Sequence, residues 1–148
     1  MAGVRTYNPS RVVVIMDGFP ISGFADGTFV NITMINEGIT TQVGADGEIA
    51  RAINSDRRCT VTITLQQTSP ANDFLSVLFN TDILTCGGAI GPILIQDLCG
   101  ETIFAASQAW ITKPADVEFG KEITNRAWAI QTGAPGVFIV GGNGNLGQ

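Results

Sequence analysis

The stretch 60-TVTITLQQTSPANDFLSV-77 changes its hydrophobic period in the middle. In its first half Val61, Ile63 and Leu65 alternate with threonines, which is the pattern of a half-buried strand. After it, the Ser69 side chain is suited to accept a hydrogen bond from a free backbone amide at the start of a helix. Pro70 fits the first helical position, because an N–H there would have no partner within the helix. The sequence therefore predicts a strand followed at once by a capped helix.

The predicted helix spans about residues 70–85. Asp73 favours the positive end of its dipole, and Gly87 and Gly88 end it. Its expected apolar stripe consists of Ala71, Phe74, Leu75, Leu78 and Phe79, and its expected polar side consists of Asn72, Asp73, Ser76 and Asn80. We therefore expect an amphipathic helix that lies on a sheet.

Composition narrows the classes of function. The 148 residues suffice for one domain with a core of its own. The net charge of −5 offers no general attraction to nucleic acid or to an anionic membrane. Only 14% of the residues are charged while 45% are hydrophobic. This balance favours an assembly over a monomer whose whole surface is exposed to water. No apolar run is long enough to span a bilayer, and the first residues lack a signal-peptide core, so we expect synthesis in a cytoplasm and no membrane insertion.

Histidine is absent, which removes the commonest general base and metal ligand. Cys59, Cys86 and Cys99 show no Cys-x-x-Cys spacing, so reduced, buried thiols are expected. Gly142-x-Gly144-x-x-Gly147 resembles a dinucleotide fingerprint, but the printed sequence has no helix after it, so we expect no cofactor. No catalytic constellation and no metal site are predicted.

The rest of the chain is predicted to be short strands separated by turns. A three-stranded meander is expected from residues 11–16, 19–24 and 28–35, with a tight hairpin turn at Asp17-Gly18. Later strands are expected at residues 90–98, 102–112, 122–132 and 137–140. Trp110 and Trp128 on these strands are expected in the core, with a subunit contact as the alternative.

The strand at residues 102–112 is apolar on both predicted sides. One side contains Ile103, Ala105, Ser107, Ala109 and Ile111, and the other contains Phe104, Ala106, Gln108 and Trp110. A strand of this kind belongs in a sheet that is covered on both faces. A neighbouring subunit would provide the second cover.

Residues 37–58 hold much of the charge of the chain and show no long apolar face. We predict an extended hairpin or a long loop that acts as an arm; a surface loop without a partner is the alternative. The small basic group of Arg51, Arg57 and Arg58 would contact phosphate or, more in keeping with an acidic protein, pair with acidic groups across an interface.

The segment 44-GADGEIARAINSDRRCTVTITLQQTSPANDFLSVL-78 resembles the tail tube proteins of contractile-tailed bacteriophages. The resemblance lies in the Asp-Gly-Glu loop, the Asn-Ser-Asp-Arg-Arg segment, the threonine strand and the Gln-Thr-Ser-Pro-x-Asn-Asp entry to the helix. It implies a mainly β, sandwich or barrel-like subunit with one flanking helix. The strand would help to build a sheet around a central channel, and the helix would cover the side of that sheet away from the channel. The resemblance also implies a single domain over residues 1–148, with a short N-terminal arm (1–10) and a Gly-rich C-terminal tail (141–148).

In function, the resemblance implies a virion protein that closes into hexameric rings, which stack into the inner tube through which DNA passes. The implied partners are other copies, the tail sheath, the baseplate and the tape-measure protein, with viral DNA passing unbound. The arm would reach an adjacent subunit or ring, and its candidate contact residues are Thr40, Gln42, Asp46, Glu48, Arg51, Asn54, Asp56, Arg57 and Arg58.

We expect some acidic residues to face the channel or its rim, because they would repel phosphate. The candidates are Asp46, Glu48, Asp56, Asp97 and Glu101. Two alternatives stay open: the tube of a related injection system (an R-type pyocin or a type VI secretion system), and another virion ring protein such as a tail terminator.

Overall fold

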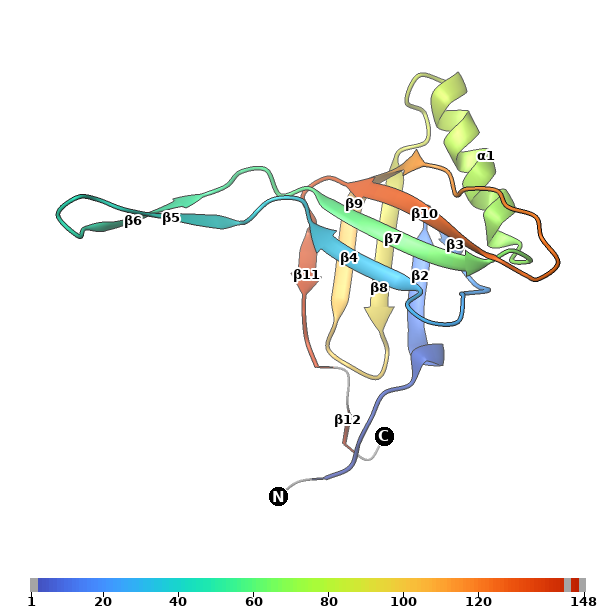
Figure 1. Cartoon of the computed structure of the whole chain (residues 1–148), viewed down its shortest axis with the longest axis horizontal. Helices are drawn as coiled ribbons and strands as arrows, with labels where there is room; N and C mark the ends of the chain where they lie inside the picture. The colour runs from blue at the N-terminus through green and yellow to red at the C-terminus, as the bar shows by residue number, and fades with distance from the viewer. Residues whose placement is uncertain (1–2, 143–144, 147–148) are drawn as a thin grey trace.

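The structure is a computed structural model that describes residues 3–142 and 145–146. It is mainly β, as predicted, with one α-helix and one short 3₁₀ turn in the described part of the chain (Figure 1). The elements are β1 (Arg5–Thr6), η1 (Pro9–Arg11), β2 (Val12–Met16), β3 (Phe19–Pro20), β4 (Val30–Met34), β5 (Ile39–Val43), β6 (Ile49–Ile53), β7 (Cys59–Gln66), α1 (Ala71–Leu84), β8 (Gly91–Asp97), β9 (Ile103–Lys113), β10 (Asn125–Thr132), β11 (Val137–Ile139) and β12 (Asn145–Leu146).

One antiparallel sheet folds into two layers. Its strand order is β3-β2-β8-β9-β10-β7-β4, and β11 also pairs with β9. In Figure 1, β4, β7 and β10 cross in front of β2, β8 and β9. Buried side chains of both layers, including Val61 and Ile63 from one and Val14 and Ile93 from the other, form a single hydrophobic cluster. The predicted sandwich or barrel-like fold is confirmed.

Strand β9 connects the layers by changing partners along its length. One edge of β9 pairs with β8 from Ile103 to Ala109, and the other edge pairs first with β11 and then with β10. Ala106 lies opposite Ile93 and Ala109 lies opposite Gly91, so β9 carries an extra residue between these pairs. This bulge moves the core-facing positions from Phe104 and Ala106 to Ala109 and Ile111.

The predicted division of this strand into two faces was therefore wrong beyond the bulge. A strict period of two assigns Ala109 to the side of Ala105, but the extra residue reverses the sides. The strand looked apolar on both faces in part because the bulge moves its buried residues from one set of alternate positions to the other. The rest is real, because Ile103 and Ala105 point away from the core and are half-buried.

The first three predicted strands do not form a meander. Asp17 and Gly18 do make the predicted hairpin turn, both with positive φ, between β2 and β3. However, β3 has only two residues, and β4 pairs with β7 in the other layer. The chain leaves the first layer because Ile21 and Ala25 are buried and the backbone at Gly23, with a φ of 77°, packs against Ser69.

Strand β7 has the predicted alternation. Cys59, Val61, Ile63 and Leu65 are fully buried, while the threonines between them lie on the outer face. Ser69 then accepts a hydrogen bond from the amide of Ala71 and donates one to the carbonyl of Ser22. The predicted helix start is therefore confirmed within a residue.

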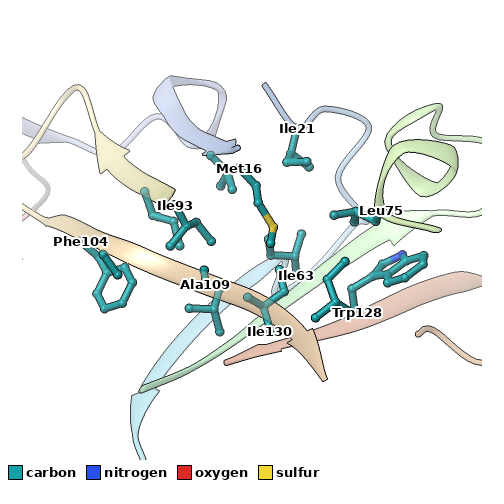
Figure 2. Close-up of a cluster of buried hydrophobic side chains, with 14 of the residues drawn as sticks. Met16, Ile21, Ile63, Leu75, Ile93, Phe104, Ala109, Trp128 and Ile130 are labelled. Atoms are coloured by element: carbon teal, nitrogen blue, oxygen red, sulfur yellow. The ribbon is translucent and has the colours of Figure 1, made fainter. Parts of the chain in front are cut away.

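The helix packs against the core side of β7, opposite the threonines of its outer face. Ala71 and Leu75 belong to the same cluster as Ile63, and Phe74 stacks on Phe19 of β3 at 4.3 Å between ring centroids. Figure 2 shows Leu75 beside Trp128 at the edge of this cluster. The helix therefore closes one open end of the two layers.

Asn72, expected on the polar side of the helix, is buried. Its side-chain oxygen accepts from the indole N–H of Trp128 at 2.9 Å, and its nitrogen donates to the carbonyls of Gln66 and Ser69 at 3.0 and 3.1 Å. One amide thus connects the end of β7, the start of α1 and a core tryptophan. The core placement predicted for Trp128 is confirmed, whereas Trp110 is only half-buried.

The cysteines differ from the expectation of buried thiols. Cys59 is buried, and burial raises the pKa of its thiol, but Cys86 is exposed and Cys99 is half-buried. All three are free. In the described residues, no helix is long and apolar enough to cross a membrane.

We predict that Asn72→Ala destabilises the fold by about 2–3 kcal/mol, because it leaves the buried indole N–H of Trp128 without its partner and removes the side-chain bonds to the Gln66 and Ser69 carbonyls. Urea unfolding followed by tryptophan fluorescence measures the change. Asn80→Ala, on the exposed side of the same helix, is the matched control. Equal stability of the two variants would contradict the bridging role.

Candidate assembly surfaces

The arm, defined as residues 36–58, projects from the body as a β-hairpin (Figure 1). Its strands β5 and β6 form a separate two-stranded sheet with Ile39 opposite Ile53 and Val43 opposite Ile49. Of the two forms that the sequence left open, the structure has the extended hairpin. An isolated hairpin is marginally stable in water, so the arm lacks the packing that stabilises the body.

The tip of the arm is a tight turn. The Gly44 amide donates to the Glu48 carbonyl at 2.8 Å, and the Gly47 amide donates to the Gly44 carbonyl at 3.0 Å. Gly47 has a φ of 87°, a conformation that favours glycine. The Asp46 carboxylate accepts from the Glu48 amide at 3.1 Å, so this acidic group helps to form the turn.

The base of the arm is held by Asp56. Its carboxylate accepts two hydrogen bonds from the Arg58 guanidinium, both at 2.8 Å, and one from the Asn36 amide at 2.7 Å. This bidentate bond with Arg58 lowers the pKa of Asp56 and raises that of Arg58. We call this group the base clasp. It joins the two chain segments that enter and leave the arm.

The nine arm residues named from the sequence occupy different places. Thr40 and Gln42 share one face of the hairpin with Ala50 and Ala52, while Arg51 lies opposite Thr41 on the other face. Asp46 and Glu48 are at the tip. Asn54, Asp56, Arg57 and Arg58 are at the base, where Asn54 accepts from the Asp56 amide. The three arginines therefore do not form one basic group.

Sequence reasoning missed the apolar side of the arm. Ile39, Val43, Ile49 and Ile53 lie on the same face and are 50%, 62%, 68% and 79% exposed. We call these four residues the arm stripe. The signal was present as alternation in 39-ITTQV-43 and 49-IARAI-53, but each run has only five residues and Arg51 interrupts the second.

The acidic candidates do not gather in one place. Asp46 and Glu48 are at the arm tip and Asp56 is in the base clasp. Asp97 is 6% exposed and accepts from the Cys99 amide in the turn after β8, and Glu101 is exposed in that same turn. The structure thus places the five carboxylates in three separate regions.

The layer formed by β4, β7 and β10 has an uncharged, polar outer face. We call it the threonine face, and its outward positions are Asn31, Thr33, Thr60, Thr62, Thr64, Asn125, Ala127, Ala129 and Gln131. Lys113 and Asp116, 3.8 Å apart, lie beside it in a hollow of about 300 Å³. Hydroxyls, amides and methyl groups thus cover this face, with the charges at one side.

The layer formed by β2, β8, β9 and β11 has an apolar outer face. Ile15, Leu94, Ala105 and Val137 lie in one row across the strands, and Val13, Gln96, Ile103 and Ile139 lie in the next. A hollow of about 620 Å³ opens on the first row, also lined by Pro92 and Gly136. We call this hollow and the second row the sheet groove. Such a surface is unusual on a protein that stays monomeric.

These features define a β-sandwich subunit with a projecting arm and apolar outer surfaces, and comparisons with known proteins identify its family. The family model described as "Bacteriophage PhiTE tail tube protein" matches residues 19–138. The chain therefore belongs to the phage PhiTE tail tube family, a family of structural proteins of the virion.

The chain is also similar to a curated relative in sequence and to a solved structure in fold. The chain is 28% identical over 139 residues to "Structural protein ORF10" of Pseudomonas phage KPP10, covering 88% of this chain and 80% of the relative. Its fold is similar to that of the anti-feeding prophage cap, described as a tube-terminating cap, with a TM-score of 0.63 and 11% identity over 91% of this chain and 92% of that one.

We predict that the base clasp opens when Asp56 is protonated. Because its folded-state pKa is lowered, the clasp is complete above the usual aspartate pKa of about 3.9 and is lost as the pH falls through the lower folded value. In NMR spectra the Arg58 Nε–H signal should be shifted at neutral pH by its hydrogen bond to Asp56, and it should move to the position of a free arginine as the pH falls through the folded-state pKa of Asp56.

Asp56→Asn should give the same free-arginine position at neutral pH, because a neutral amide cannot accept the bidentate bond. Asp46→Asn, at the tip, is the matched control and should leave the Arg58 signal unchanged. An Arg58 signal that keeps its original position in Asp56→Asn would contradict this interpretation. Overall stability should change little, since both partners are partly exposed.

Proposed function

We propose that this chain polymerises as stacked hexameric rings into the inner tube of a contractile phage tail, which forms the channel for DNA delivery. The observation that carries the proposal is the arm: a hairpin with an exposed apolar face that no part of the described chain covers. Membership of a tail tube family supports it. The hexameric ring and the contractile tail rest on the resemblance of residues 44–78.

The role is mechanical and needs no catalysis, so we propose a structural protein that is not an enzyme. Its partners would be other copies within and between rings, the sheath outside, the baseplate at the end and the tape-measure protein during assembly. Its site of action would be the virion, after synthesis in the host cytoplasm. Residues 36–58 would connect neighbouring subunits.

We further propose that the threonine face lines the channel. Of the two outer sheet faces, it alone lacks large apolar side chains and can stay in contact with water. Its own groups are neutral, and Lys113 beside it is paired with Asp116, so DNA would pass without being held. The exposed acidic residues at the arm tip and in the turn after β8 would then lie at the rim and add repulsion.

A tube terminator is the second candidate, since the fold also resembles a tube-terminating cap. That likeness concerns the fold alone. The two roles differ in how assembly ends: a tube protein makes head-to-tail contacts that repeat without limit, whereas a terminator forms one closed ring.

We predict that the purified protein forms hollow tubes or stacked rings with sixfold symmetry, visible by negative-stain electron microscopy and growing with concentration. A variant with residues 39–53 replaced by a Gly-Ser linker should keep the near-ultraviolet circular dichroism of its folded body but remain unassembled, because the body does not depend on the arm. Closed rings that never stack, even with baseplates added as nuclei, would favour the terminator.

The channel assignment predicts selective labelling of Thr62→Cys in a background with Cys86→Ser and Cys99→Ser, which leaves only the buried Cys59 among the native thiols. Within assembled tubes, a small maleimide should react with position 62, whereas a maleimide joined to a large polyethylene glycol should not, because it cannot enter the channel. The unassembled subunit should react with both. An Asn80→Cys variant, exposed on the helix and outside both the threonine face and the other sheet face, is the control for general accessibility. Labelling of position 62 in tubes by the large reagent would overturn the assignment.

A further inference from the structure

Two apolar surfaces of the described chain have no partner within it: the arm stripe and the sheet groove. The stripe presents four β-branched side chains, each at least half exposed. The groove has a floor of small residues, Ala105 and Gly136, between the larger Ile15, Leu94 and Val137. The first surface is therefore convex and the second concave.

The arm of one copy cannot reach its own groove in this structure. Figure 1 shows the hairpin extending away from the body, and its residues pair only with each other. Two complementary surfaces at separate places on one chain make a head-to-tail contact, which repeats from copy to copy. Each copy supplies one stripe and one groove, so every groove would be filled except at an end of the assembly.

The polar groups on the two surfaces are also compatible in charge and in hydrogen bonding. Arg51 is the charged residue within the stripe face, where it lies opposite Thr41. Gln96 is the polar residue within the two rows of the groove, and its side-chain oxygen can accept from a guanidinium. No lysine or arginine lines the described groove, so docking leaves no like charges opposed.

We propose that the arm stripe of one copy docks in the sheet groove of a second copy, with Ile39, Val43, Ile49 and Ile53 as the anchoring side chains. The inference rests on the proposed tube function and adds the surface that receives the arm. It also explains why the outer side of β2, β8, β9 and β11 is apolar, because another copy covers it. The threonine face then stays free of the arm.

Photo-crosslinking tests the docking surface directly. Benzoylphenylalanine replaces Ile49 on the stripe or, as matched control, Ala50 on the opposite face of the same strand. Each protein is mixed with an equal amount of ¹⁵N-labelled unsubstituted chain, assembled, illuminated, digested and analysed by mass spectrometry. Adducts from position 49 should join to labelled peptides containing residues 92–107 or 134–139, and adducts from position 50 should not.

Adducts from position 49 to another surface, such as the threonine face or the helix, would overturn the inference while tubes in the micrographs leave the tube function standing. Adducts to an added sheath protein alone would do the same. If the unsubstituted chain forms no assembly even with baseplates added, the tube function fails and the inference fails with it.

Substitution provides a second readout. Ile53→Asp, on the stripe, should raise the lowest concentration at which assemblies form by about 10- to 100-fold, as expected when one large buried side chain is lost from a contact. Ala52→Asp carries the same charge on the other face of β6 and should have a much smaller effect. Val137→Asp, in the groove and 40% exposed, should match Ile53→Asp. Equal effects of positions 52 and 53 would overturn the role of the stripe.

Discussion

The alternation along β7 is the constraint on which the rest of the structure depends. This strand lies between β4 and β10, with four fully buried side chains on one face and threonines on the other. A shift of one residue would bury the threonines and expose the core, so the register is strongly determined. The same alternation that forms the core also creates the uncharged outer face.

The two ends of β7 hold the two parts that differ most from a simple sandwich. At its start, Cys59 pairs with Met34, and the chain between them forms the arm above the Asp56–Arg58 clasp. At its end, the Gln66 carbonyl accepts from Asn72, so the helix is tied to the strand through a buried amide. Arm and helix are therefore placed by one rigid element, which suits a subunit whose contacts must repeat from copy to copy.

The sequence predicted what local periodicity and turn chemistry determine. The strand-to-helix segment, the Asp17-Gly18 turn and most later strands follow from patterns a few residues long. The first meander and the faces of β9 were wrong because they depend on contacts between layers: Ile21 and Ala25 draw the chain across the sandwich, and a bulge reverses the sides of β9. Asn72 was assigned to solvent for the same reason, since its partner Trp128 lies 56 residues away in the sequence.

The arm shows why a functional surface is harder to predict than a core. Its polar residues are noticeable in the sequence because they are concentrated there. Four of them nevertheless form the turn and the base clasp that give the hairpin its shape: Asn36, Asp46, Asp56 and Arg58. Its apolar residues are few and spread over two short strands, and they form one surface only when Ile39 faces Ile53 and Val43 faces Ile49. A side chain that leaves water only in the assembly carries no burial signal within a single chain. The surface that covers such a side chain has to be found by its matching shape and chemistry. We propose the apolar outer face of β2, β8, β9 and β11 for the arm stripe, because that face is hollowed and apolar.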